Sequence, residues 1–175
     1  VLYGGRFSLL IGLCSTLIAL FFGAIIGSIA AVVRKSFSEA IMRVMDIIMA
    51  VPGIAMAAVS VLVFGRTLSK SGNTFGLVVV IICSIAFVYI PQLSRIVRAN
   101  VMAAYGEDYV RAVIVSGARA PWILTKHVMR NTAAPVLVFA TVLVADAIIL
   151  DASLTFIGSG LQATTVATWG TDLSE

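Results

Sequence analysis

The sequence predicts an all-α, polytopic membrane protein built as a bundle of transmembrane helices. Of its 175 residues, 61% are hydrophobic and only 11% are charged, whereas a soluble domain carries about 25% charged residues. The mean hydropathy is +1.10, and the chain contains apolar runs long enough to cross the roughly 30 Å of bilayer hydrocarbon. The core of a soluble protein of 175 residues cannot enclose several such runs. The lipid bilayer is therefore a predicted partner.

The first predicted span covers 7–33, which holds no charged residue. Small residues recur in it every three or four positions, which predicts a face where another helix approaches closely. These residues are Gly12, Ser15, Ala19, Gly23 and Gly27. The second span, 47–64, follows a loop or interfacial helix at 36–45. It contains Pro52 and Gly53, which predict a kink near its start.

The third predicted span covers 74–93 and is rich in β-branched residues, but its length favours a helix over a strand. The fourth covers 132–150 and carries Asp146, with Asp151 directly after it. Carboxylates in such positions face protein or a water-filled cavity. Five residues of helix turn the two side chains to different sides, so they do not form a pair for acid/base chemistry.

The segment 94–131 holds six of the twelve basic residues and, as acidic residues, only Glu107 and Asp108. Because basic loops stay on the cytoplasmic side, this segment and 34–46 are predicted to be cytoplasmic, and 65–73 external. The net charge of +4 is therefore explained by membrane orientation, and nucleic acid is not an expected partner.

The basic segment has an internal pattern of helix, glycine turn and helix. Glu107 and Asp108 favour the start of a helix, Gly117 ends it, and Pro121 begins a second one. An apolar face of the first helix consists of Tyr109, Val110, Val113 and Ile114. Such a face fits a groove on a partner, the membrane surface or the protein's own loops.

No residue pattern indicates a catalytic, cofactor-binding or metal site, so the chain is not expected to be an enzyme. Cys14 and Cys83 lie within apolar runs and are expected to be packing residues. The one histidine, His127, stands near Lys126 and Arg130 at a predicted membrane boundary and is given no catalytic role. A nucleophile with a base at matched depth is not found.

The basic segment also carries a resemblance. Its residues Glu107-Asp108-Tyr109-Val110-Arg111-Ala112, Gly117 and His127-Val128-Met129-Arg130-Asn131 resemble the EAA loop of the inner-membrane permeases of bacterial ABC importers. The family pattern is Glu-Ala-Ala, three residues, Gly, nine residues and Ile-x-Leu-Pro. Ala112, Gly117 and the spacing are kept, whereas Arg111 replaces the glutamate, Val113 an alanine and Arg130 the proline. The loop is thus a degenerate form of the family's.

Further stretches resemble the dipeptide/oligopeptide branch of these binding-protein-dependent permeases, which also includes nickel and glutathione transporters. They are 4–13, 42–46, 50–52 and the tail at 151–162, followed by Trp169-Gly170. The tail is the most specific to the branch, although Asp151 stands where the branch has glutamate.

The resemblance implies a transmembrane bundle of the type I ABC importer permease kind, with a cytoplasmic coupling helix at Glu107 to Ser116. It implies a location in the bacterial inner membrane and four kinds of partner: a second homologous permease, two ABC ATPases that bind ATP-Mg, and an extracytoplasmic substrate-binding protein. The chain would form half of a translocation pathway and hold no cofactor itself. Expected coupling residues are Glu107, Asp108, Tyr109, Arg111, Ala112 and Gly117, and candidates for the pathway are Asp146 and Asp151.

Residues 1–175 are interpreted as one permease domain, expected to be a fragment that lacks the first and last membrane spans, with 151–175 external. An alternative is an ion-coupled secondary transporter, which also uses intramembrane carboxylates and broken helices. That alternative does not explain the helix, glycine, helix pattern. The cargo stays open among dipeptides, longer peptides, glutathione and nickel.

Overall fold

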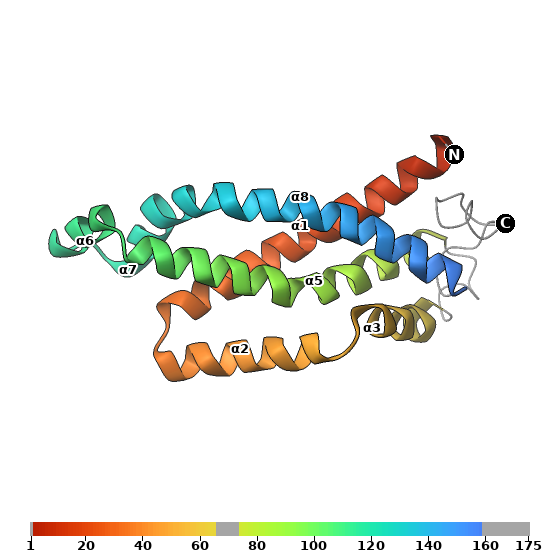
Figure 1. Ribbon diagram of the computed structural model, residues 1–175, viewed down its shortest axis with the longest axis horizontal. Helices are drawn as coiled ribbons and strands as arrows, with labels where there is room; N and C mark the ends of the chain where they lie inside the picture. Colours follow the sequence, from red (N-terminus) through yellow and green to blue (C-terminus); the bar gives the residue numbers. More distant parts are fainter. Residues whose placement is uncertain (1, 66–73, 159–175) are drawn as a thin grey trace.

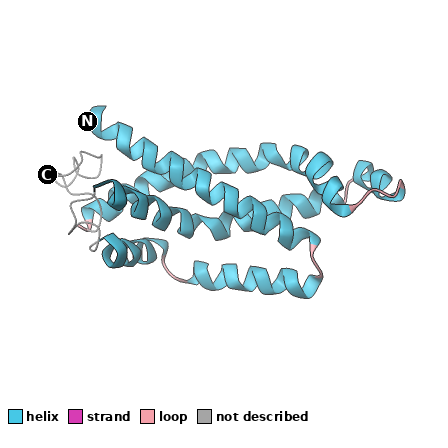
Figure 2. Cartoon of the chain, turned by 180° about the vertical axis from the view of Figure 1, so that it is seen from behind, coloured by secondary structure: helices cyan, strands magenta, loops and turns pink. Residues whose placement is uncertain are grey.

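The chain folds as a bundle of helices. The computed structural model describes residues 2–65 and 74–158, and these contain no strand, which confirms the all-α prediction (Figure 2). Two of the elements, η1 and η2, are π-helices. In chain order the elements are α1 (Leu2–Val32), α2 (Lys35–Ala50), α3 (Gly53–Ser60), η1 (Val61–Gly65), α5 (Thr74–Tyr105), α6 (Asp108–Val115), α7 (Ala120–Ile123), η2 (Leu124–Val128) and α8 (Met129–Phe156).

Three long helices make the body of the bundle. α1 packs against both α5 and α8, and these two also pack against each other, so that the three run side by side along the long axis (Figure 1). Helices Gly5–Val32, Thr74–Tyr105 and Ala120–Phe156 are each long and apolar enough to cross a membrane. A fourth crossing is added if the bent pair α2 and α3/η1 counts as one span.

Close contact between α1 and its neighbours depends on glycine. A Cβ atom built on Gly27 would lie 2.5 Å from the carbonyl oxygen of Ser94, and one on Gly23 would lie 2.6 Å from Leu93 Cβ. On the α8 side, a Cβ atom at Gly12 would lie 2.7 Å from Ile148 Cγ1. The prediction that small residues in 7–33 allow close helix approach is confirmed, because only glycine leaves room for the facing helix at these points.

Two apolar clusters lie along the bundle. The first joins α1, α3, α5 and α8, and the second joins the end of α5 to α6, α7, η2 and the start of α8. Outer faces stay apolar and exposed, as for Phe21, whose exposed fraction is 62%, which suits contact with lipid. Cys14 packs against the first cluster, Cys83 is exposed, and both are free thiols.

The second predicted span needs correction at its start. Of the two alternatives for 36–45, a loop or an interfacial helix, the helix is confirmed, since α2 begins at Lys35, and it continues to Ala50, into the predicted span. The chain then breaks at Pro52, and the helix that follows is turned by 81°, so the predicted kink is confirmed. Proline lacks the N–H for helix bonding and keeps the preceding residue extended, and Val51 accordingly has ψ of 130°.

Helix ends near the basic segment also differ from the prediction. The loop does not start at Ser94, since α5 continues to Tyr105. Its second helix is continuous with the fourth span, because α7, η2 and α8 form one helix, Ala120–Phe156. The hydropathy of a segment indicates which residues suit the hydrocarbon core of the bilayer. A helix can continue beyond that core until a residue interrupts its hydrogen bonds.

Parts of the predicted external segments can be placed. Residues 151–156, which were predicted to be external to the membrane, belong to α8. Residues 66–73 and 159–175, including Trp169-Gly170, lie outside the described residues.

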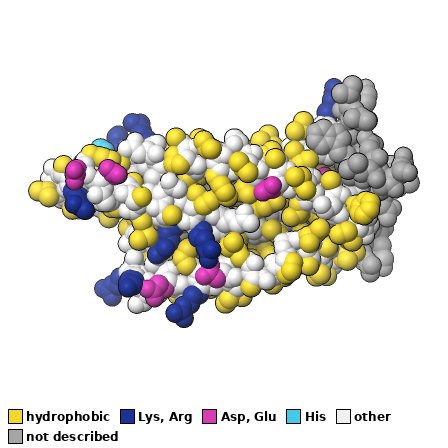
Figure 3. Space-filling model, in the orientation of Figure 1, with side chains coloured by type: hydrophobic (Ala, Val, Ile, Leu, Met, Phe, Trp, Pro, Cys, Tyr) yellow, Lys and Arg dark blue, Asp and Glu magenta, His cyan; other side chains and the backbone are white. Residues whose placement is uncertain are grey.

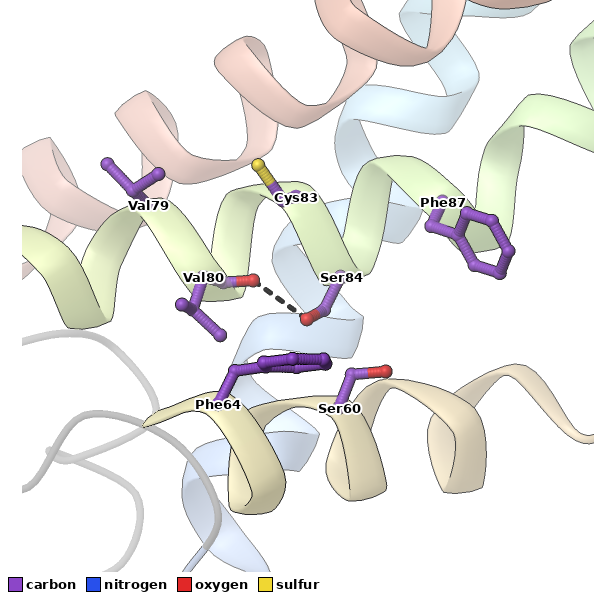
Figure 4. Close-up of a pocket in the computed structure, with 7 residues that line it drawn as sticks. All are labelled: Ser60, Phe64, Val79, Val80, Cys83, Ser84 and Phe87. Carbon is purple, nitrogen blue, oxygen red and sulfur yellow. Dashed lines mark hydrogen bonds between the residues drawn. The ribbon is translucent and has the colours of Figure 1, made fainter. Parts of the chain in front are cut away.

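A shallow crevice separates the bent segment from α5. Its volume is about 370 Å³, and it is lined by Ser60, Phe64, Val79, Val80, Cys83, Ser84 and Phe87. Figure 4 shows Phe64 and Ser60 directed toward α5, where Ser84 Oγ donates a hydrogen bond of 2.7 Å to the Val80 carbonyl of its own helix. Because this hydroxyl bonds within α5, it does not fasten α3 and η1 to α5.

The turn between α1 and α2 lies at the same end of the bundle as α6 and α7 (Figure 1). Most of the Lys and Arg side chains visible in Figure 3 gather toward this end. The charge pattern assigned two segments, 34–46 and 94–131, to one side of the membrane. Both segments reach the same end of the bundle.

Replacing Gly27 with Val is expected to lower stability. The added side chain would force α1 away from Ser94 on α5, and overpacking of this kind costs about 1–3 kcal/mol. The measurement is the apparent melting temperature in detergent, with Leu17→Val on the exposed face of α1 as the matched control. An unchanged melting temperature for Gly27→Val would contradict the close approach of the two helices.

Candidate functional site

The helix, glycine, helix prediction for the basic segment is confirmed. α5 ends in a tight turn at Gly106, where the Gly106 N–H donates to the Ala103 carbonyl at 3.0 Å. α6 starts after its N-cap residue Glu107 and ends at Val115. After a glycine turn, α7 begins at Ala120 with Pro121 in its first turn. This segment projects from one end of the bundle (Figure 1).

Gly117 makes the turn after α6. Its φ is +82°, a left-handed conformation that costs residues with a Cβ about 1–2 kcal/mol. Its N–H donates to the Ile114 carbonyl at 2.9 Å, and the Ala118 N–H donates to the Val113 carbonyl at 3.4 Å. These bonds close the last turn of α6, so the helix is capped by backbone geometry that glycine alone adopts readily.

One side of α6 attaches to the bundle and the other is exposed. Val110 is fully buried in the second cluster, which also contains Val101 of α5 and Val128 of η2. On the other side, Val115 is 87% exposed. The predicted apolar face is thus divided, since Val110 and Val113 pack inward whereas Tyr109 and Ile114 are exposed.

The predicted coupling residues gather on this exposed end. Glu107 and Asp108 stand at the start of α6, and Arg111 and Ala112 are exposed one turn later. Glu107 makes no side-chain cap bond to the helix, and Arg111 has no ion pair within the described ranges. Acidic and basic groups therefore both face outward on a short, fixed helix.

The two candidate carboxylates on α8 occupy different environments. Asp146 is exposed, whereas Asp151 is fully buried and neither of its carboxylate oxygens has a hydrogen-bond partner. They do not meet the coupling residues, because Asp151 lies 22 residues after the start of α8, about 33 Å at 1.5 Å per residue. The prediction that the two side chains face different sides is confirmed.

Two polar contacts that the sequence reasoning missed hold α2 to α5. Arg95 forms an ion pair with Asp46, and Arg98 Nε donates a 2.9 Å hydrogen bond to Ser38 Oγ. The signal in the sequence was the pair of arginines three residues apart, which share one face of a helix. A partner on α2 could not be chosen before α2 was known to be helical.

A third missed contact joins α6 to α8. Asn131 Nδ2 donates a 2.8 Å hydrogen bond to Tyr109 Oη. Both residues fall within the stretches that carry the family resemblance, but their spacing of 22 residues gave no reason to pair them.

Comparison with known proteins identifies the family. A family model described as the binding-protein-dependent transport system inner membrane component matches residues 23–175. The chain belongs to this family. Its fold is accordingly that of a type I ABC importer permease, a multi-pass membrane protein and a transport component.

Similar proteins come from the peptide branch. A putative peptide transport system permease protein of Brucella suis is 38% identical over 175 residues, which are 100% of this chain and 55% of the relative. The di/tripeptide transport system permease protein of Pseudomonas aeruginosa is 36% identical over 99% of this chain and 54% of its own. The oligopeptide transport system permease protein of Bacillus subtilis is 33% identical over 98% and 53%. The chain spans about half the length of these curated relatives, and the resemblance to the peptide branch is confirmed.

Replacing Asp151 with Asn is expected to raise the apparent melting temperature in detergent. A buried carboxylate without a hydrogen-bond partner costs about 1–3 kcal/mol, and the amide has nearly the same shape without the charge. Asp146→Asn is the matched control, since a change at this exposed residue is expected to stay within about 0.5 kcal/mol. A lower melting temperature for Asp151→Asn would show that the carboxylate has a stabilising partner.

Proposed function

We propose that this chain is a permease subunit of an ATP-driven ABC importer for peptides and forms half of its translocation pathway. Family membership and the names of the relatives support the transport role. The observation that carries the proposal is α6, a short helix fixed at both ends and exposed at one end of the bundle. Such a helix suits docking into a groove on a partner.

The proposed partners are two ABC ATPases, a second homologous permease and an extracytoplasmic binding protein. The ATPases bind ATP-Mg and catalyse hydrolysis, so this chain has no catalytic residue of its own. The membrane is the bacterial inner membrane, and the basic segment lies on its cytoplasmic side, because that end of the bundle carries most of the visible basic side chains. α6 then faces the compartment that contains ATP.

In the proposed mechanism the ATPases move α6 when they close on ATP. α6 follows α5 after a tight turn at Gly106, and it packs against α5 and α7, with Val110 buried in the second cluster. A displacement of α6 therefore reaches two membrane-crossing helices. Rigid motion of packed helices of this kind can change which side of the membrane the pathway opens to.

Contact with the ATPase is proposed to rest on Glu107, Asp108, Tyr109, Arg111, Ala112 and Gly117. Arg111 reverses the charge at the position of the family's glutamate, so the facing ATPase residue is expected to be acidic or neutral. Glu107 and Asp108 supply the negative charge instead, at the start of α6. Within the membrane, exposed Asp146 is the better candidate for lining the pathway, and buried Asp151 is the weaker one.

The function is tested by uptake into proteoliposomes. The full-length permease is reconstituted with its partner permease, ATPases and binding protein, and uptake of radiolabelled di-, tri- and pentapeptides is measured. We expect uptake that requires internal ATP-Mg and continues after an ionophore collapses the ion gradients. Uptake driven by an ion gradient without ATP would contradict the proposal and favour a secondary transporter.

Replacing Gly117 with Pro is expected to uncouple ATP hydrolysis from uptake. Proline fixes φ near −65° and removes the N–H, whereas Gly117 has φ of +82° and donates to the Ile114 carbonyl. We expect hydrolysis to continue while peptide uptake per ATP falls by about tenfold or more, a barrier change of about 1.4 kcal/mol.

Ser116→Ala is the matched control, because it removes only the hydroxyl that bonds to the Ala112 carbonyl one turn earlier. Normal coupling in Gly117→Pro would remove α6 from the proposed mechanism.

A further inference from the structure

Apolar packing by itself would hold α6 only loosely against the bundle. Val110 of α6 belongs to the second cluster, and the partly buried Val113 packs against it. Such contact is not directional, so it holds α6 near the bundle without fixing how the helix is rotated.

Beside this packing lies a polar cavity of about 270 Å³. It is bounded by the end of α5, the start of α6 and the first turn of α8, and its lining consists of Asn100, Ala103, Ala104, Glu107, Tyr109, Asn131 and Thr132. Across such a pocket the facing helices make no van der Waals contact with each other. Direct packing between α6 and α8 is therefore reduced at this point.

The Tyr109 to Asn131 hydrogen bond crosses this region. Asn131 Nδ2 lies 2.8 Å from Tyr109 Oη, and in the part of the chain that the structure describes it is the one side-chain hydrogen bond that joins α6 to another helix. It connects the start of α6 directly to the start of α8.

The path along the backbone between the same helices is less direct. It passes through the turn at Gly117, the short helix α7 and the π-helix η2. A glycine turn and a change of helical type are both places where a chain can bend. A movement sent along this path passes through the Gly117 turn before it reaches the helix Ala120–Phe156.

We propose that Tyr109 and Asn131 form a positioning pair that transmits movement of α6 to α8. This inference rests on the proposed function, because it assumes that a partner ATPase moves α6. Tyr109 sets the rotation of α6 through its hydroxyl, and Asn131 receives the displacement in the first turn of α8. The pair acts on coupling and not on ATP hydrolysis.

The test uses the reconstituted full-length complex and measures two rates, ATP hydrolysis and uptake of radiolabelled tri-alanine. Tyr109→Phe and Asn131→Leu each remove the hydrogen bond and are expected to lower uptake per ATP hydrolysed by about fivefold. That factor corresponds to one hydrogen bond of about 1 kcal/mol. The double variant is expected to be no worse than either single one, because both remove the same interaction.

Two further variants separate a positioning role from a structural one. In Asn131→Asp the carboxylate can accept a hydrogen bond from the Tyr109 hydroxyl, so this variant is expected to keep coupling. Tyr105→Phe is the matched control, since its hydroxyl lies 3.4 Å from the Ala120 carbonyl and does not contact α6. It is expected to couple normally.

The outcomes distinguish this inference from the proposed function. If the parent complex shows no ATP-dependent uptake of any peptide tested, the proposed function fails. If the parent couples normally, an unchanged ratio in Tyr109→Phe and Asn131→Leu overturns the positioning pair. An equal fall of hydrolysis and uptake, or additive losses in the double variant, overturns it as well.

Discussion

The bundle depends on the close approach of α1 to α5. Gly23 and Gly27 bring the backbone of α1 so near to Leu93 and Ser94 that a single methyl group has no room. Lipid offers no hydrophobic force to press helices together, since its tails are as apolar as the side chains. Close contact between atoms of the two helices is what remains to hold them, and it requires small residues on at least one side.

This contact also sets the position of the C-terminal end of α5. Arg95 and Arg98 follow the contact by only a few residues, and they hold α2 through Asp46 and Ser38. Further along, Val101 makes the surface on which Val110 of α6 packs. The close packing of α1 and the position of α6 therefore both depend on one helix, α5.

Much of the candidate site could be predicted from local signals. The acidic start at Glu107, the left-handed turn at Gly117 and the helix restart at Pro121 each depend on the chemistry of one or two residues, and the structure confirms all three. Helix ends were harder to predict. α5 continues past Ser94 because nothing after that residue interrupts its hydrogen bonds until Gly106, and hydropathy does not report on this.

The sequence by itself determined that the chain is helical, lies in a membrane and carries a capped helix between two spans, because composition and turn chemistry act over short distances. Only the tertiary structure decided which polar groups meet. Arg95 pairs with Asp46 across 49 residues of sequence, and Asn131 pairs with Tyr109 across 22. Asp151 is buried while Asp146 is exposed, although both stand on one apolar helix. Such differences depend on which neighbouring helix covers each face, and no local pattern contains that information.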